Sequence, residues 1–168
     1  DTFVVLEGGG LSGLLDCGAG GFDSLAFAGG AYQEIVSTPS GPDSGFVAVD
    51  GATFAYAGLE PITVDTSAPN VVIDLGGLNA AEAASLSMSA GMVTFESTAP
   101  SAQFESFTFA TPAESLTIRL GGQDDVLNIG VLDLFDAHLH PRRRRRRRGL
   151  SERRCQSRRP RPDHQRRD

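Results

Sequence analysis

Apolar and polar residues alternate with a period of two through most of the first 140 residues. This period puts successive side chains on opposite faces of an extended strand, so each run predicts a strand with one buried face. The runs are short, and turn residues separate them every 8–12 residues or so, which is typical of all-β proteins. We therefore expect an all-β fold. The predicted strands are residues 3–6, 25–27, 34–37, 46–49, 53–57, 62–64, 71–75, 86–89, 92–96, 104–109, 115–120 and 126–129.

Two dipeptides between alternating runs predict β-hairpins. Asp50-Gly51 and Ala90-Gly91 each lie between two expected strands, and Gly tolerates the positive φ that a tight two-residue turn requires. The one helix-like stretch is residues 79–84, Asn-Ala-Ala-Glu-Ala-Ala. A run of this length is marginal for a helix, so we expect a single helical turn there at most.

A short frame, in which an acid is followed by x-Leu-x-apolar, occurs at Asp23, Glu114 and Asp125. We interpret it as one strand type used repeatedly, with the Leu and the last apolar residue pointing inward. Reused strands are typical of solenoids, so we predict a segment of β-solenoid or β-helix with some hairpins. A β-sandwich of the immunoglobulin or jelly-roll type is the alternative, because the two hairpins favour antiparallel pairing.

Charge divides the chain into two parts. Residues 1–140 contain 18 acidic residues and a single base, Arg119, for a net charge of −17, whereas residues 141–168 contain 14 Arg and three acids, for +11. We therefore predict an acidic all-β region over 1–140 and a disordered Arg-rich tail over 141–168. A region this acidic repels itself unless cations neutralise it, and extracellular fluid supplies cations and screening salt.

The Arg-rich tail has three interpretations. It is a basic arm for an anionic partner, an ordinary solvated tail, or the product of a frameshift, because repeated GAC codons for Asp become CGA codons for Arg out of frame. Arg142 begins an unbroken run of seven Arg, and no aromatic residues are interleaved with it. Nucleic-acid binding normally combines basic and aromatic residues in such segments, so we do not expect a nucleic-acid partner.

The sequence lacks the motifs of several common functions. No apolar run approaches the roughly 18 residues of a membrane-spanning helix, and no nucleophile elbow, phosphate loop or zinc-protease motif occurs. His138 and His140 have no third metal ligand at a spacing that would complete a metal site. The two cysteines, Cys17 and Cys155, fit a secreted protein and a cytosolic protein equally well. We therefore expect a non-enzymatic protein without membrane insertion. Glu60 and Glu7 are lone acids near turns and are expected on the surface.

Residues 18–26 resemble the calcium-binding RTX nonapeptide, Gly-Gly-x-Gly-x-Asp-x-apolar-x. Gly18, Gly21, Asp23 and Leu25 match this motif, while Ala19 departs from it. In RTX proteins the glycines allow a sharp loop and the Asp carboxylate helps to coordinate Ca²⁺, a cation that prefers oxygen ligands.

Residues 120–128 match the same motif more loosely, at Gly121, Asp125 and Leu127, and Asp124 adds a second carboxylate. The resemblance implies Asp23, Asp124 and Asp125 as calcium ligands. RTX sites occur in tandem, however, since each ion lies between adjacent turns, and these two stretches are about a hundred residues apart.

Over residues 18–135 the chain is similar to segments of very large repetitive bacterial surface proteins of the adhesin and RTX type. The resemblance implies secretion or surface display, calcium-supported folding and a role in attachment. We predict a structural or adhesive module of an extracellular repeat protein, stabilised by calcium. An RTX-type calcium-dependent folding module and a glycan-active β-helix fragment are the alternatives; the last requires acids clustered in a groove.

Two expectations concern the whole protein. The chain begins at Asp1, without an initiator Met or a signal-like stretch, and we expect a fragment of a larger protein. The expected partners are neighbouring repeats of the same parent chain, and glycans or proteins of a host or another surface.

Overall fold

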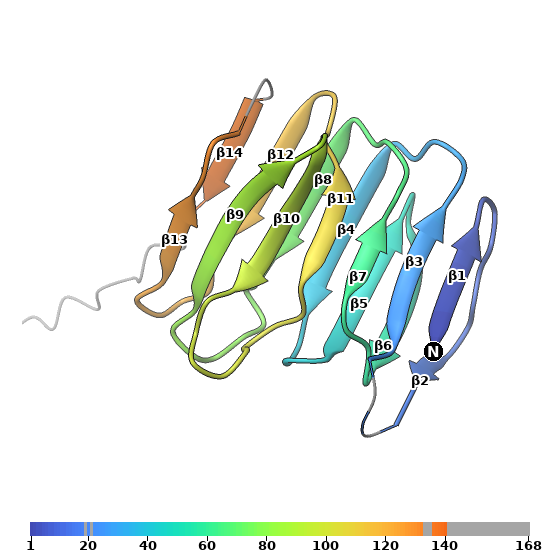
Figure 1. Cartoon of the computed structure of the whole chain (residues 1–168), viewed down its shortest axis with the longest axis horizontal. Helices are drawn as coiled ribbons and strands as arrows, with labels where there is room; N and C mark the ends of the chain where they lie inside the picture. The colour runs from blue at the N-terminus through green and yellow to red at the C-terminus, as the bar shows by residue number, and fades with distance from the viewer. Residues whose placement is uncertain (19, 21, 133–135, 141–168) are drawn as a thin grey trace, which may run out of the picture.

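The computed structural model describes residues 1–18, 20, 22–132 and 136–140. Within these residues the protein is all-β: fourteen strands form two open, seven-stranded sheets, and there is no helix. The sheets lie one behind the other as two layers (Figure 1). No helix in the described ranges is therefore long and apolar enough to cross a membrane.

The order of strands in each sheet differs from their order in the sequence. Sheet A contains, from one edge to the other, β1 (Thr2–Leu6), β3 (Ser24–Ala28), β7 (Ile62–Val64), β11 (Phe107–Ala110), β10 (Met92–Ser97), β9 (Ala83–Ser89) and β13 (Val126–Ile129). Sheet B contains β14 (Asp136–His140), β12 (Ser115–Arg119), β8 (Asn70–Asp74), β4 (Glu34–Pro39), β5 (Ser44–Val49), β6 (Ala52–Ala57) and β2 (Leu14–Asp16).

Most strands of each sheet run in one direction. In sheet A, β1, β3, β7 and β11 form a parallel ladder, β9 and β13 run the same way, and only β10 is antiparallel to its neighbours. In sheet B, β4, β8, β12 and β14 form a parallel ladder, and only β5 is antiparallel. Hairpins interrupt both ladders, so both sheets are mixed.

The chain passes from sheet A to sheet B at one end of the molecule (Figure 1). Strands β3, β7 and β11 of sheet A lead directly to β4, β8 and β12 of sheet B, so the strands of sheet B begin where those of sheet A end. Both two-residue hairpin turns also lie there, and we call it the hairpin end. At the opposite end six of the seven strands of sheet A begin, and we call this the acidic end for the residues described below.

The two hairpins predicted from sequence are confirmed. The φ angles are 49° and 86° at Asp50 and Gly51, and 52° and 80° at Ala90 and Gly91. Positive φ at both central residues defines the type I′ turn, whose twist matches that of the flanking strands. Each turn joins strands that are paired in register on either side of it.

The core lies between the two sheets and consists of alternate residues of each strand. In β3, for example, Leu25 and Phe27 are fully buried while their neighbours are half-buried. Phe27 of sheet A meets Phe54 of sheet B edge to face, with ring centroids 5.2 Å apart. Each such fully buried aromatic side chain contributes about 1.5–3 kcal/mol of hydrophobic stabilisation.

The predicted all-β class is confirmed, and every predicted strand overlaps an observed one. Strands β2 and β14 were missed, and residues 104–106 are not strand, although Phe104 is buried and stacks on Phe95 with ring centroids 5.0 Å apart. The predicted helical turn at 79–84 is wrong, because Ala83 and Ala84 pair within sheet A as part of β9. The Arg-rich tail at 141–168 lies outside the described residues.

Candidate functional site

Acidic residues precede the strands of sheet A at the acidic end. Asp23, Glu60 and Glu105 each lie two residues before the first inward-pointing core residue of β3, β7 and β11, and Glu82 and Asp125 do the same for β9 and β13. Because side chains alternate along an extended chain, a residue two positions before a core residue points toward the same side. Asp23, Glu82 and Glu105, which are buried, therefore point toward the space between the two sheets.

Backbone hydrogen bonds hold these acids in line beyond the ends of the strands. The Glu60 N–H donates to the Asp23 carbonyl at 2.5 Å, and the Val126 N–H donates to the Glu82 carbonyl at 2.8 Å. Neighbouring strands lie about 4.8 Å apart. At about 5 Å and an effective dielectric constant near 20, two carboxylate charges repel by about 3 kcal/mol. Ionising neighbouring acids at this end of the sheet therefore costs free energy unless positive groups lie close to them.

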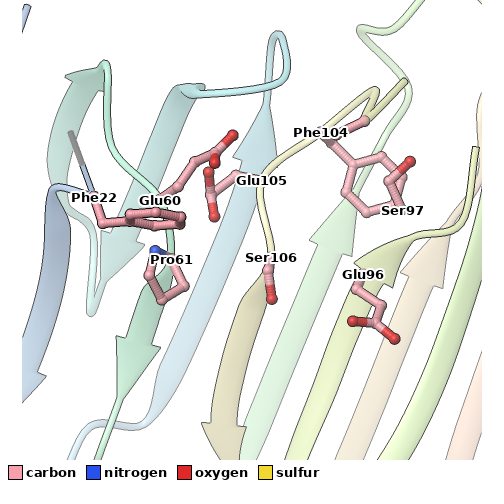
Figure 2. A pocket seen from close by; sticks show the side chains of 9 residues that line it. Phe22, Glu60, Pro61, Glu96, Ser97, Phe104, Glu105 and Ser106 are labelled. Carbon is pink, nitrogen blue, oxygen red and sulfur yellow. The ribbon is translucent and has the colours of Figure 1, made fainter. Parts of the chain in front are cut away.

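Glu105 is buried, at 3% exposure, and has no hydrogen-bond partner for its carboxylate oxygens among the described residues. Figure 2 shows the Glu105 carboxylate beside that of Glu60, and the two are turned toward each other. Burial first, and then the charges of Glu60 and Asp43, raise the pKa of Glu105 to about 8, although the nearby Ser106 backbone N–H opposes this rise.

Tyr56 of β6 adds a second unpaired polar group to this end. Its hydroxyl is buried without a hydrogen-bond partner in the described part of the chain. Burial and the nearby charges of Glu105 and Asp43 raise the pKa of this hydroxyl. Gly45 of β5 provides the space for it, since a Cβ there would lie 2.7 Å from the Tyr56 oxygen.

A cleft of about 270 Å³ opens at the acidic end beside these residues. Three glutamates contribute to its wall, and Phe22, which is 89% exposed, lies beside Pro61 at its edge (Figure 2). The lining residues are Phe22, Glu60, Pro61, Glu96, Ser97, Ala102, Phe104, Glu105 and Ser106.

Glu82 and Asp125 form a second acidic pair farther along the same end. Glu82 is 1% exposed, and its backbone N–H donates to Asp125 Oδ1 at 3.1 Å. Burial first, and then the neighbouring Asp125 carboxyl, raise the pKa of Glu82 to about 7. Gly121 packs closely here, since a Cβ at that position would lie 2.8 Å from Glu82 Oε2.

The three calcium ligands implied by the sequence do not come together. Asp23 is 7% exposed and precedes β3, and its Oδ1 accepts a hydrogen bond from the Asp1 amino group at 2.5 Å. Asp125 is half-buried and Asp124 is exposed, and both precede β13. Since β3 and β13 are five strand spacings apart in sheet A, about 24 Å separates the two loops. Calcium binding at either loop stays a prediction.

Asp23, Glu60, Glu82, Glu105 and Asp125 lie along the starts of the sheet A strands, and we call them the acidic row. The sequence analysis did not predict that Glu60, Glu82 and Glu105 belong to one such group. Glu60 is exposed, as expected for a lone acid near a turn, but it also lines the cleft. The acid-x-apolar-x-apolar frame carried the signal, because it also fits Glu60-Pro-Ile-Thr-Val and Glu105-Ser-Phe-Thr-Phe. The frame copy at Glu114 belongs instead to the start of β12 in sheet B, at the hairpin end.

Positive side chains do not neutralise this row. Arg119 is the only Lys or Arg in the described ranges, and its guanidinium pairs with Asp74 at 3.2 Å. Buried carboxyl groups without such partners hold a proton or attract a hard cation. No three His, Cys, Asp or Glu side chains of the described part already stand in a metal-binding arrangement.

We found no protein-family model that matches the chain, and no significant match to it among curated proteins or solved structures.

Proposed function

We propose that the chain is a structural module of an extended secreted or surface-displayed β protein, which stacks edge to edge on neighbouring modules of the same kind. The observation that carries this proposal is apolar surface at both ends of the strand order. Side chains that point toward the core are exposed there: Phe3 of β1 is 36% exposed, and Ile129 of β13 is 50% exposed.

The edge formed by β1 and β2 has the clearest opening. An apolar cleft of about 250 Å³ lies against β1, and its walls include Phe3, Val5, Leu15 and Phe54. Leu6 and Leu14 are 64% and 57% exposed beside it. In the described part of the chain, no further strand covers this edge. An uncovered edge of this kind is a template for pairing with another strand.

The parallel ladders suit the same proposal. A new pair of strands added beside β1 and β2, or beside β13 and β14, would extend both sheets in the direction in which the ladders already run. This is how modules of a solenoid-like array stabilise one another, through nearest-neighbour interfaces. The proposal thus includes the solenoid-like stacking expected from sequence, with the hairpins as local insertions.

A glycan-active protein is the second candidate, because three glutamates line one cleft. A carboxyl that transfers a proton must reach the substrate. Both oxygens of Glu105 are closed off from solvent, which makes this residue poorly placed for that role. We therefore prefer the structural proposal.

Sedimentation velocity of the full chain tests the stacking. High salt should be used throughout, since it screens attraction between the Arg-rich segment and the acidic region. We expect association that grows with protein concentration. Leu14→Lys and Ile129→Lys place a charge on one uncovered edge each and should abolish it.

The matched control is Phe46→Lys. Phe46 is 46% exposed but lies on β5, an interior strand of sheet B, so this variant should associate as the wild type does. A wild-type chain that stays monomeric at every concentration, or an equal loss in all three variants, contradicts the proposal.

A further inference from the structure

The acidic end contains an acid pair that the sequence motifs do not single out. Glu60 and Glu105 come from two neighbouring strands of sheet A, β7 and β11, whose ladder is in register at Ile62 and Phe107. Each Glu lies two residues before its strand's paired position, so the two carboxyls are side by side. Figure 2 shows them turned toward each other at the wall of the cleft.

Two further oxygen groups lie at the same place. The charge of Asp43 acts on both Glu105 and Tyr56, and the Asp43 carbonyl accepts a hydrogen bond from Leu59 N–H at 3.1 Å, next to Glu60. The Tyr56 hydroxyl is buried without a partner. Glu105 of sheet A therefore has the buried hydroxyl of Tyr56, a residue of sheet B, in its electrostatic neighbourhood.

A cluster of acids is common on an acidic protein, but an unpaired buried carboxylate is not. Glu105 is 3% exposed and neither of its oxygens has a hydrogen-bond partner in the described part. The one described Arg is engaged with Asp74 in sheet B. The Ser106 backbone N–H favours the charged form of Glu105, but no positive side chain of the described part offsets the hydration that this carboxylate loses on burial.

We propose that Glu60 and Glu105 bind a calcium ion at the acidic end of the molecule, with the Tyr56 hydroxyl as an additional oxygen ligand. Calcium suits this site because it accepts six to eight oxygens in flexible geometry, including carboxylates that bind through one or both oxygens. Magnesium requires a nearly ideal octahedron and keeps its water. The ion draws the two carboxyls together, and backbone carbonyls and water complete its shell.

The site has a structural consequence. It joins the loop before β7 to the loop before β11, and through Tyr56 it joins sheet A to sheet B. Binding of an ion to the folded state alone stabilises that state. This inference does not depend on edge-to-edge stacking, since the site lies among interior strands of the sheets.

Calorimetric titration and thermal unfolding of the full chain, first freed of metal with a chelator, test the proposal. CaCl₂ should bind at one site of the acidic end and raise the unfolding temperature, with MgCl₂ at matched ionic strength much weaker. Glu105→Gln and Glu60→Gln should each weaken calcium binding by at least roughly 10-fold, the scale for perturbed metal sites. Glu34→Gln, an exposed acid at the hairpin end, should bind within about twofold of the wild type.

Three results would overturn the proposal: no calcium response in the wild type, equal binding by Glu105→Gln and the wild type, or loss of binding in Asp23→Asn or Asp125→Asn alone. The last result would place the ion in the loops implied by the sequence motif. Misfolding is separated from ligand loss in chelator, where Glu105→Gln should unfold at the wild-type temperature or above it.

Discussion

Asp50 at the hairpin end and Glu105 at the acidic end are acids in opposite situations. At the hairpin end, Asp50 Oδ1 accepts backbone hydrogen bonds from Gln33 at 2.7 Å and Glu34 at 3.0 Å. At the acidic end, Glu105 is buried and accepts none in the described part. An acid before a strand is therefore a satisfied turn residue or an unpaired buried charge, depending on whether the fold supplies donors.

This difference in donors has a reason in the topology. The Asp50 turn lies beside the start of β4, where two N–H groups of the incoming chain are not used by the sheet. The chain before β7 and β11 continues the ladder instead, since the Glu60 and Ile62 N–H groups bond to neighbouring carbonyls. The ladder has therefore used the Glu60 and Ile62 N–H groups, so neither of them donates to the Glu105 carboxyl.

The largest expected effect is at the hairpin end. Asp50→Ala removes the acceptor of two backbone hydrogen bonds and places Ala at a φ of 49°. Together these changes should lower the free energy of unfolding by about 2–3 kcal/mol, measured by urea denaturation. Asp50→Asn, which keeps an acceptor and tolerates positive φ, should cost well under half as much. Equal losses in both variants would contradict the account of this turn.

The opposite sign is expected at the acidic end. Glu105→Gln removes a buried group whose charged form has no partner, so the free energy of unfolding should rise by about 1 kcal/mol at pH 8 in chelator. The same urea denaturation measures it. A loss similar to that of Asp50→Ala would mean that the Glu105 carboxylate has a donor after all.

A pH dependence sharpens the comparison further. The pKa of Glu82 is raised to about 7 in the folded state, from an ordinary value of 4.5. The folded state thus binds a proton more tightly than the unfolded state. The stability from this group is fully present below pH 4.5 and is lost as the pH rises through about 7.

Urea midpoints in chelator between pH 4.5 and 8 measure this effect. The fall in stability over this range should be smaller in Glu82→Gln than in the wild type, by at least about 1 kcal/mol. Glu34→Gln, at the hairpin end, should keep the wild-type slope. Parallel curves for wild type and Glu82→Gln would mean that Glu82 titrates as an ordinary carboxyl.

The smallest effect is expected at the exposed ion pair. Arg119 and Asp74 are 3.2 Å apart with partly exposed side chains, and such pairs contribute about 0.2–1 kcal/mol. Arg119→Met should therefore lower the free energy of unfolding by no more than this, and less in high salt. A larger loss would show that Arg119 neutralises more of the acidic region than Asp74 alone.

Sequence reasoning found the strands well and the site poorly, for different physical reasons. The bounds of β7 and β13 were predicted because alternation with a period of two is a local property, and the hairpin at Asp50-Gly51 because turn chemistry is local. β2 has only three residues, Leu14–Asp16, which is too short for a pattern to form.

Acids that are neighbours in the acidic row are far apart in the sequence. Glu60 and Glu105 are 45 residues apart and become neighbours only because β7 pairs with β11. The motif at Asp23 drew attention to glycines, whereas what the acids of the row share is their distance from the first core residue of a strand. Strand order, which depends on long-range pairing, decides which of these acids meet.

The central claim is that the acidic end buries Glu105 and Glu82 beside other acids, with no positive side chain of the described part to neutralise them. NMR titration of the ¹³C carboxyl signals of the full chain in chelator tests it most directly. The account predicts that Glu105 titrates near pH 8 and Glu82 near pH 7. If both residues titrate near the ordinary value of about 4.5, the carboxyls are solvated or paired and the claim is wrong.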